Sequence, residues 1–399
     1  MSWHVSWEGA LILWTALGAV WWWIAYVVVR ASPPKPPSRD VDNVPRDDRS
    51  LSIFKPLASP LDDSELARLR PCLESFVAEL DELSELLLGC QEPERAALTR
   101  FVDDMRRAYP EARVRLLVAA GPTHWPNPKV GMLRILARSA QGELWFWSDA
   151  DVVAPPGMLR TLRADFAASD SSLLTCPYVI AEDGQGAGIL DKLYVNLEIL
   201  PGVLLLARFG PVGFALGAGM WFEAERFRRL VDWEELGRSL ADDYRLGGLM
   251  APADVASVRL RTIPAARGLK RALRHYLRWQ KTVRWCQPGG YAAQVLVLPV
   301  LGWLGAVVAA PGSPVSWLGL VGTLTLDSFA ALAICRAAGH PISRGRLPVL
   351  PLWSLARGLA WGISWLPGPV YWRGRRWWRP VARLRKPVPI LQEGRKEID

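Results

Sequence analysis

Cysteine is scarce in this 399-residue chain, and its few copies exclude two kinds of site. No two of them have the C-x-x-C spacing, with histidine partners, that zinc sites and redox motifs use. We therefore expect reduced, buried thiols in a cytosolic compartment. The five cysteines are Cys72, Cys90, Cys176, Cys286 and Cys335.

Glycine-rich phosphate loops are also missing. No G-x-G-x-x-G follows the first predicted strand, where Lys55-Pro56-Leu57 stands instead, and no P-loop occurs. Dinucleotide-dependent oxidoreduction is therefore disfavoured. The net charge is +9, from 48 Lys+Arg against 39 Asp+Glu, but no zinc, helix-turn-helix or RNA-binding signature accompanies it. Nucleic acid is thus not an expected partner.

Long apolar runs, by contrast, are present. The chain has 21 tryptophans and 50% hydrophobic residues, which is typical of a membrane protein. Residues 10–29 are uncharged and long enough to cross a bilayer, and they lack the small-residue cleavage site of a signal peptide. Glu8 is the only acidic or basic residue (Asp, Glu, Lys or Arg) before this run, whereas several basic residues follow it. We therefore expect the N-terminus outside and the rest of the chain in the cytoplasm. The basic residues are Arg30, Lys35, Arg39 and Arg46.

Two further apolar runs indicate a helical hairpin that crosses the membrane out and back. They cover residues 291–310 and 315–334, with Pro311-Gly312-Ser313-Pro314 between them. Asp327 lies inside the second run. A carboxylate at this depth is expected to face protein or a polar path rather than lipid.

Two apolar stretches contain charges that argue against simple spans. Residues 347–370 include Arg357 and several prolines, with basic loops on both sides, so we favour a re-entrant or interfacial segment over a crossing. Residues 197–220 include Glu198 and Arg208. They predict an interfacial helix or a lipid-facing wall, with an ordinary buried helix and strand as the alternative.

Two polar segments flank these regions. The proline-rich residues 32–38 predict a stiff linker. Residues 372–386 mix Trp with Arg and Lys, as a stretch lying on anionic lipid headgroups does, which also explains the net charge.

Between residues 51 and 264 short β-rich runs alternate with helical patterns. This alternation predicts βαβ units and a mostly parallel sheet, in a domain large enough to bury a core. Strands are expected at 51–57, 84–90, 114–120, 143–149 and 172–179, and helices near 63–80, 93–108, 129–140 and 156–168.

The fourth predicted strand ends at two aspartates one residue apart. The run E-L-W-F-W-S-D-A-D is continuously apolar before Asp149 and Asp151, as only a buried strand tolerates. Both acids should therefore emerge at the carboxyl end of a central strand, where open α/β sheets bind ligands. Two carboxylates at this spacing can hold a divalent cation that grips a diphosphate. The alternative is a solvated turn.

Four other features carry weaker signals. Glu92 follows the second strand at the same sheet edge, although a surface glutamate is the simpler reading. Asn127-Pro128-Lys129 opens a helix, from which a lysine can reach a phosphate.

Asp242-Asp243-Tyr244 places two acids about 100° apart on a helix, so one faces the cleft and can act as a general base. In His275-Tyr276-Leu277-Arg278-Trp279, the guanidinium can bind a phosphate bidentately beside an indole wall.

Taken in order, these motifs resemble membrane-anchored inverting glycosyltransferases of the GT-A fold, specifically the ceramide glucosyltransferase family and its bacterial relatives that glycosylate ceramide or hopanoids. The likeness runs from about residue 52 to 285, and the anchor and hairpin also fit. It rests on K-P-L at 55–57, C-Q-E-P at 90–93, N-P-K at 127–129, S-D-A-D at 148–151, P-Y-V at 177–179, G-A-G-M at 217–220, A-D-D-Y at 241–244 and H-Y-L-R-W at 275–279.

The resemblance implies a role for each matching residue. Asp243 is the catalytic base and Asp151 the ligand of Mg²⁺ or Mn²⁺. Binding of the nucleotide-sugar is implied for Lys55, Glu92, Lys129, Asp149, His275, Arg278 and Trp279. Two positions depart from the family: Glu92 stands where Asp is usual, and His275 where Gln or Arg is usual. The first departure puts the nucleobase contact in doubt.

The resemblance also implies an organisation and a reaction. We expect a transmembrane anchor at 1–30, a linker at 31–49, a cytoplasmic GT-A domain at 50–288, a membrane region at 289–371 and a basic tail at 372–399. The expected reaction moves glucose from a UDP-sugar to a ceramide-like membrane lipid, at the bacterial inner membrane. Alternatives are a hopanoid-type N-acetylhexosaminyl transferase, a processive polysaccharide synthase and a non-catalytic membrane scaffold.

Overall fold

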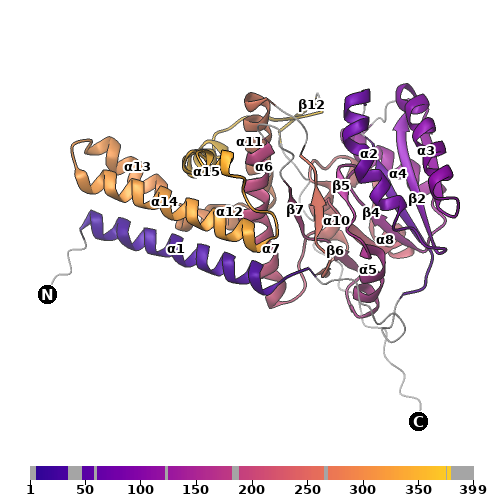
Figure 1. Cartoon of the computed structure of the whole chain (residues 1–399), viewed down its shortest axis with the longest axis horizontal. Coiled ribbons are helices and arrows are strands. Elements are labelled where there is room, and N and C mark those ends of the chain that lie inside the picture. Colours follow the sequence, from indigo (N-terminus) through magenta and orange to yellow (C-terminus); the bar gives the residue numbers. More distant parts are fainter. Residues whose placement is uncertain are drawn as a thin grey trace, which may run out of the picture.

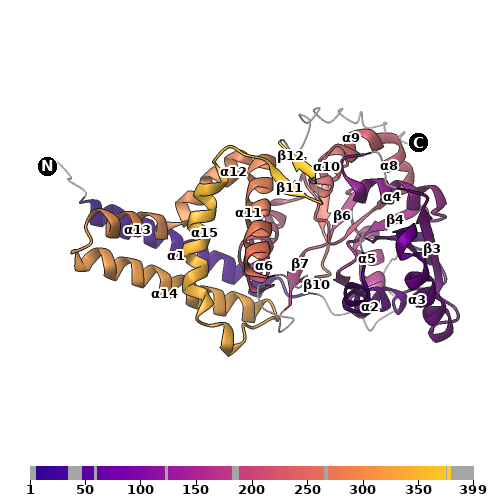
Figure 2. The same cartoon turned by 90° about the horizontal axis from the view of Figure 1, so that it is seen from above.

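The computed structural model describes residues 6–34, 47–57, 61–121, 125–181, 188–264, 268–373 and 375–378. Figures 1 and 2 show two parts along the longest axis, a sheet flanked by helices at one end and a group of helices at the other. Residues 35–46 and those after 378 lie outside the described residues. The predictions for most of the linker, and for most of the basic tail, therefore stay predictions.

A seven-stranded sheet with the order β3-β2-β1-β4-β8-β6-β9 forms the first part. Strands β3, β2, β1 and β4 are parallel neighbours, β8 is antiparallel to both β4 and β6, and β6 is parallel to β9. The expected mostly parallel sheet is confirmed, with β4 at its centre. The strands are β1 (Leu51–Pro56), β2 (Ser84–Gln91), β3 (Arg113–Ala119), β4 (Leu144–Trp147), β6 (Leu173–Thr175), β8 (Met220–Glu223) and β9 (Ala253–Val255).

Helices cover both faces of this sheet. Because side chains alternate along a strand, Ile53 of β1 packs in one core with α2, α3 and α5, while Phe54 packs in the other with α4, α8, α9 and α10. The four predicted helices are confirmed. The helices are α2 (Asp63–Val77), α3 (Arg95–Ala108), α4 (Pro128–Ser139), α5 (Met158–Ala167), α8 (Ala224–Leu230), α9 (Trp233–Gly237) and α10 (Asp242–Leu249).

The single strand predicted at 172–179 is wrong, because the chain forms two strands there. β6 ends at Thr175, and after Cys176-Pro177 the chain enters β7 (Tyr178–Ile180) in a second sheet with the order β5-β10-β7. A proline has no N–H to donate to a ladder, which favours a break at Pro177. The second sheet also contains β5 (Val152–Val153) and β10 (Leu260–Thr262).

The other part contains the apolar helices. α1 (Trp7–Ala31) and α14 (Pro314–Ala337) are each long and apolar enough to cross a membrane, which supports a membrane protein. The first arm of the predicted hairpin is bent: α12 (Pro288–Ala293) and the 3-10 turn η4 (Gln294–Val297) meet α13 (Pro299–Ala309) at 59°. Counting this bent pair as one span gives three crossings.

Shorter helices run between the two parts. α15 (Val349–Ser364) crosses α1 and α14 instead of running along them, as Figures 1 and 2 show, which agrees with an interfacial or re-entrant segment. α11 (Leu269–Cys286) contacts α6 (Gly188–Tyr194) and α15. Residues 197–220 begin in a π-helical segment, η2 (Val195–Ile199), and continue as α7 (Leu200–Leu206), which packs on α1 before the chain enters β8. Residues 197–206 form a mostly buried helix, but residues 207–219 lie outside the α-helices and strands, and Leu206 and Phe209 are 50% and 84% exposed, so neither interpretation describes the whole stretch.

A network of buried polar side chains joins the membrane helices. Asp327 of α14 is 1% exposed; its carboxylate accepts from Trp22 Nε1 at 2.7 Å and from the Ser354 hydroxyl of α15. Arg357 lies 4.8 Å over the Trp22 ring and pairs with Glu198 of η2 at 3.4 Å. The expectation that Asp327 faces protein is confirmed, and the network ties α1, α14, α15 and η2 together.

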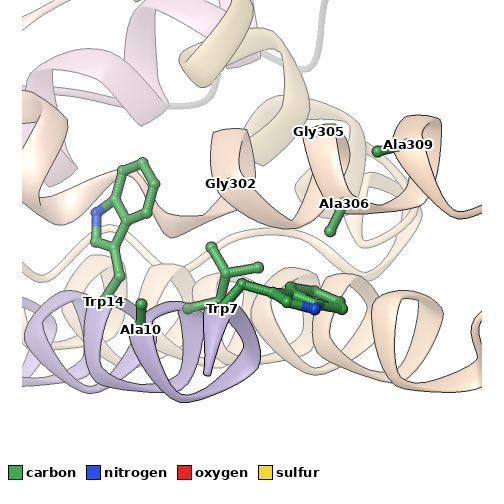
Figure 3. Close-up of a pocket in the computed structure, with 8 residues that line it drawn as sticks. Trp7, Ala10, Trp14, Gly302, Gly305, Ala306 and Ala309 are labelled. Carbon is green, nitrogen blue, oxygen red and sulfur yellow. The ribbon is translucent and has the colours of Figure 1, made fainter. Parts of the chain in front are cut away.

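Small residues bring α13 close to its neighbours. A Cβ added to Gly302 would lie 2.5 Å from Leu11 Cδ2 of α1, and one added to Gly319 of α14 would lie 2.3 Å from the Trp303 ring. Beside this contact an apolar groove of about 460 Å³ opens between α1 and α13, lined by Trp7, Ala10, Leu11, Trp14, Gly302, Gly305, Ala306 and Ala309 (Figure 3). Close approach of small residues is a usual basis of helix association in membranes.

We expect Asp327→Ala to lower the stability of the membrane part. The substitution leaves the Trp22 N–H and the Ser354 hydroxyl without their acceptor, at a cost of about 1–3 kcal/mol. Thermal unfolding of the purified chain in detergent measures the loss. Asp327→Asn keeps an acceptor oxygen and should lose less, and Ser328→Ala is the control, since that hydroxyl bonds only to the Leu324 carbonyl of its own helix. An Asp327→Ala protein as stable as the Ser328→Ala control contradicts the role.

Candidate active site

Asp149 and Asp151 stand just beyond β4, at the carboxyl edge of the parallel strands, as predicted. Both residues are partly buried at the turn after β4, and Asp149 contacts Lys129 although its side chain is 41% exposed, so the metal-binding interpretation stays a prediction. Burial raises the pKa of Asp151 to about 6, the charge of Asp149 raises it further, and Arg68 and Lys55 oppose the shift. Two carboxylates held this close together favour a cation between or beside them.

Lys55 lies beneath the turn that carries Asp149 and Asp151, and its hydrogen bonds support this turn. Its ammonium is fully buried and donates to Ser148 Oγ at 2.9 Å and to the Asp149 carbonyl at 2.8 Å, and it lies 3.4 Å from the centre of the Phe76 ring. Burial lowers the pKa of Lys55 to about 7, while Cys72, Asp151 and Asp149 oppose the shift. The structure therefore places Lys55 behind the acids, in a position that orients them.

Three of the predicted residues meet around the backbone of Gly217. A Cβ added there would lie 3.1 Å from Asp149 Oδ2, 3.2 Å from Asp243 Oδ2 and 3.4 Å from Lys129 Nζ. The Gly217 N–H donates to Asp243 Oδ2 at 3.0 Å, and its carbonyl accepts from the Asp149 N–H at 3.3 Å. Residues from β4, α4 and α10 thus converge on one point.

Lys129 provides the positive charge at this point. Its ammonium is 2.7 Å from Asp149 Oδ1 and 3.2 Å from Asp242 Oδ2. Burial opposes the charge, but Asp149, Asp242 and Asp243 together raise the pKa of Lys129 well above its usual value. The lysine therefore stays protonated, as a phosphate contact requires.

Asn127 explains why the lysine is held so firmly. Its side-chain oxygen caps α4 by accepting from the N–H groups of Lys129 and Val130 at 3.0 and 3.3 Å. Its amide nitrogen donates to the Ser239 carbonyl at 2.9 Å and to Asp242 Oδ1 at 3.2 Å. One side chain thus fixes both the helix N-terminus and the start of α10.

The two adjacent acids of α10 differ in exposure, as their helical positions predict. Asp242 is 6% exposed and points at Asn127 and Lys129, whereas Asp243 is only partly buried. Burial raises the pKa of Asp243 to about 6, Asp242 adds to the shift and Lys129 opposes it. Of the pair, Asp243 is the more exposed carboxylate and the one better able to accept a proton from a substrate.

The predicted residues of α11 form a second group. His275 Nδ1 is 2.9 Å from Asp191 Oδ1 of α6, and His275 Nε2 is 2.8 Å from Arg278 Nη2. The Trp279 ring lies 4.5 Å from the His275 ring and 5.4 Å from the Tyr194 ring, measured between centroids. Histidine and Asp191 together hold the guanidinium in place.

Tyr178 of β7 joins the two groups. It packs in the cluster that contains Trp279. Burial raises the pKa of the Tyr178 phenol, and the charges of Asp243, Asp149, Asp151 and Asp191 raise it further. Tyr178 packs against both the core beneath the sheet and the cluster that contains Trp279, so it lies between the two groups.

Glu92 is not drawn into this cluster. It follows β2 at the same sheet edge, but its side chain is 61% exposed and pairs with Arg95 at 3.2 Å. Its contact with a nucleobase stays a prediction.

The chemistry of the acids fits a divalent cation. Among the described residues no group of three or more His, Cys, Asp or Glu side chains forms a metal cluster. Mg²⁺ and Mn²⁺ in nucleotide sites commonly take one or two carboxylates and obtain their other ligands from phosphates and water. Asp151 with Asp149 suits such an ion, and both lack the further protein ligands of a closed structural site.

Three participants were missed as such by sequence reasoning. The motifs G-A-G-M and P-Y-V contain Gly217 and Tyr178, but their residue types carry no chemical signal of their own. Asp191 lies in an apolar helix far from the other motifs, and its pairing with His275 depends on the contact between α6 and α11. Only the tertiary structure reveals these roles.

Comparison with known proteins agrees with this geometry. The family model described as Glycosyl transferase family 21 matches residues 11–379. No curated protein sequence matches the chain significantly. A solved structure, the mannosyltransferase PcManGT from Pyrobaculum calidifontis in complex with GDP-Man and Mn²⁺, has a TM-score of 0.50 at 15% identity, over 89% of this chain and 99% of that chain.

A second solved structure is less similar. GalNAc-T7 with UDP, GalNAc and Mn²⁺ has a TM-score of 0.40 at 12% identity, over 64% of this chain and 52% of that chain. The expected fold class is confirmed by the likeness to the mannosyltransferase: an α/β GT-A domain with one N-terminal and several C-terminal transmembrane or interfacial helices.

We expect Gly217→Ala to reduce turnover of the nucleotide-sugar donor by roughly a hundredfold, because the added methyl group displaces reacting side chains by a fraction of an ångström. Gly213→Ala, four residues away, is the matched control, since a Cβ there meets nothing within 4 Å. Initial rates for both variants, with thermal unfolding to verify the fold, test this expectation. Equal rates for the two variants mean that the cluster around Gly217 is not the reaction centre.

Proposed function

The chain belongs to glycosyl transferase family 21, the ceramide glucosyltransferase family, and is a glycosyltransferase; we propose that it moves glucose from a UDP-sugar to the hydroxyl of a ceramide-like membrane lipid, with inversion at the anomeric carbon. The observation that carries the proposal is the convergence of Lys129, Asp149 and Asp243 on Gly217. The protonated amine of Lys129 and the carboxylate of Asp243, the proposed proton acceptor, both lie beside Gly217. Sugar transfer from a diphosphate donor requires both kinds of group.

Asp243 is the proposed base. Its half-buried carboxylate takes the proton of the incoming hydroxyl as that oxygen attacks the anomeric carbon. The bond from that carbon to the diphosphate breaks on the opposite face, so an α-linked donor gives a β-linked product. Binding of the nucleotide-sugar is assigned to Lys55, Glu92, Lys129, Asp149, His275, Arg278 and Trp279, with Lys55 acting through the turn it supports.

The leaving diphosphate requires positive charge. Lys129 supplies an ammonium beside Asp149, and Arg278 supplies a guanidinium held by His275. We propose that Asp151, beside Asp149, holds Mg²⁺ or Mn²⁺. When bound, this ion neutralises charge that develops on the departing phosphate. Both related solved structures contain Mn²⁺.

The position of the site favours an acceptor that stays in the membrane. α11, which carries Arg278 and Trp279, packs against α6, α12 and α15, and therefore connects the site to the membrane helices. An amphiphile can then present its hydroxyl at the bilayer surface without leaving it. We propose a bacterial inner-membrane location with residues 50–288 on the cytoplasmic side.

Other acceptors are distinguished by specific features. A processive polysaccharide synthase needs enough spans for a channel, and within the described residues only two or three helices qualify. A hopanoid-type transferase of N-acetylhexosamine uses the same chemistry, so product analysis has to separate it from the ceramide enzyme.

The test is sugar transfer by the purified full-length chain in lipid nanodiscs. We expect labelled UDP-glucose and ceramide to give a glycolipid that carries one hexose, with activity lost in EDTA and restored by Mn²⁺. Asp243→Asn should reduce the rate by about a hundred- to ten-thousandfold while UDP still binds. Near-normal turnover of this variant removes the assigned base. Mass spectrometry that finds N-acetylhexosamine on a hopanoid instead supports the alternative acceptor.

The rate should also depend on pH through Asp243. A base acts only when deprotonated, and its pKa is raised to about 6, so kcat/KM should fall as the pH drops below about 6 and level off above it. Asp242→Asn removes a neighbouring negative charge and so lowers the pKa of Asp243. The fall in kcat/KM should therefore occur at a lower pH in this variant. An unchanged pH dependence of kcat/KM in this variant contradicts the assignment of Asp243 as the base.

A further inference from the structure

The chain returns to the catalytic domain after its last membrane helix. Strands β11 (Val370–Trp372) and β12 (Arg375–Trp377) form an antiparallel hairpin, which Figure 2 shows beside α10 and α11. Val370 is 3% exposed and Trp377 6%, and both pack against Leu240, with Trp285 of α11 alongside. Leu240 stands two residues before Asp242, so the hairpin is anchored directly beside the acids of α10.

Arg373 lies between the two strands in a conformation that residues other than glycine rarely adopt. Its φ is 47°, and it is the one such residue found within the described part of the chain. A left-handed conformation costs a residue with a Cβ about 1–2 kcal/mol. Conformations of this kind persist where the surrounding structure enforces them, and they are concentrated at functional sites.

The hairpin packs beside the start of α10 and against α11, so Arg373 lies on the side of the molecule that carries the acids of the site, and their charges act on it. The surrounding protein lowers the pKa of its guanidinium by desolvation, and the carboxylates of Asp149, Asp151 and Asp242 oppose that shift. The side chain nevertheless keeps solvent exposure. Arg373 is therefore an exposed cation on a hairpin anchored beside the acids of α10, with its Cζ 5.3 Å from the centre of the Trp372 ring.

We propose that Arg373 is a phosphate-binding residue of the donor site, brought there by the β11–β12 hairpin, which closes the side of the site opposite the sheet. This inference rests on the proposed function, because it assumes a nucleoside diphosphate in that space. A guanidinium binds two phosphate oxygens at once, which a lysine cannot do. The C-terminal hairpin therefore completes a site whose acids come from the turn after β4 and from α10.

The test is binding of UDP and of uridine to the full-length chain in detergent with Mn²⁺, by titration calorimetry. Arg373→Gly removes the side chain and accepts the left-handed backbone, so its fold should be retained. We expect this variant to bind UDP about ten- to a hundredfold more weakly, as loss of a charged hydrogen-bonded contact predicts, and uridine with unchanged affinity. Arg373→Lys keeps the charge without the bidentate geometry and should bind UDP with intermediate affinity.

Arg375→Ala is the matched control, because it removes the same charge from an exposed position on the next strand. Its affinity for UDP should change by less than about twofold. UDP binding by Arg373→Gly equal to that of the control overturns the inference, and so does an equal loss of UDP and uridine, which indicates a distorted site. A wild-type chain that binds neither UDP nor UDP-sugars overturns the proposed function itself.

Discussion

The ammonium of Lys129 is the interaction on which the site depends. Three carboxylates from two separate segments, Asp149, Asp242 and Asp243, act on Lys129, and without a buried cation their repulsion would separate the turn after β4 from α10. Lys129 satisfies this need at 2.7 Å from Asp149 and 3.2 Å from Asp242. Asn127 holds the lysine by capping α4 and by bonding to the segment before α10. The same contacts that stabilise this part of the fold thus assemble the proposed reaction centre.

The site is shared between two layers of the molecule. The acids lie on the turn after β4 and on α10, whereas Arg278 and Trp279 belong to a helix packed on the membrane part. The contact between His275 and Asp191 fixes that helix to α6, and α6 continues into η2, whose Glu198 pairs with Arg357 of α15. Two polar contacts, joined by the continuous backbone of α6 and η2, therefore connect α15 to the proposed diphosphate wall. Tyr178, on the small second sheet, fills the boundary between the layers.

Features set by local sequence were predictable. The apolar run before Asp149 identified the central strand, because only a strand buried on both faces tolerates such a run, and the helical offset of Asp242 and Asp243 predicted that only one of the two would be exposed. Features set by tertiary contacts were not predictable. Lys55 follows the first strand like a ligand-binding residue, yet it lies fully buried beneath the acids. The break at Pro177 and the antiparallel β8 depend on pairing between distant segments, which periodicity does not report.

The sequence predicts that the catalytic domain ends at residue 288, but side chains from the two sides of this boundary pack together. Ending the domain there separates Leu240 from Val370 and Trp377, which cover it. It also removes α15, against which α11 packs. The predicted start of a basic tail at residue 372 has a similar difficulty, because that residue is the last of β11 and pairs with Arg375 of β12. In three dimensions the C-terminal hairpin therefore packs on the proposed catalytic domain, and the candidate membrane helices lie between these two segments of the chain. The membrane part then has a structural role in the site in addition to anchoring it.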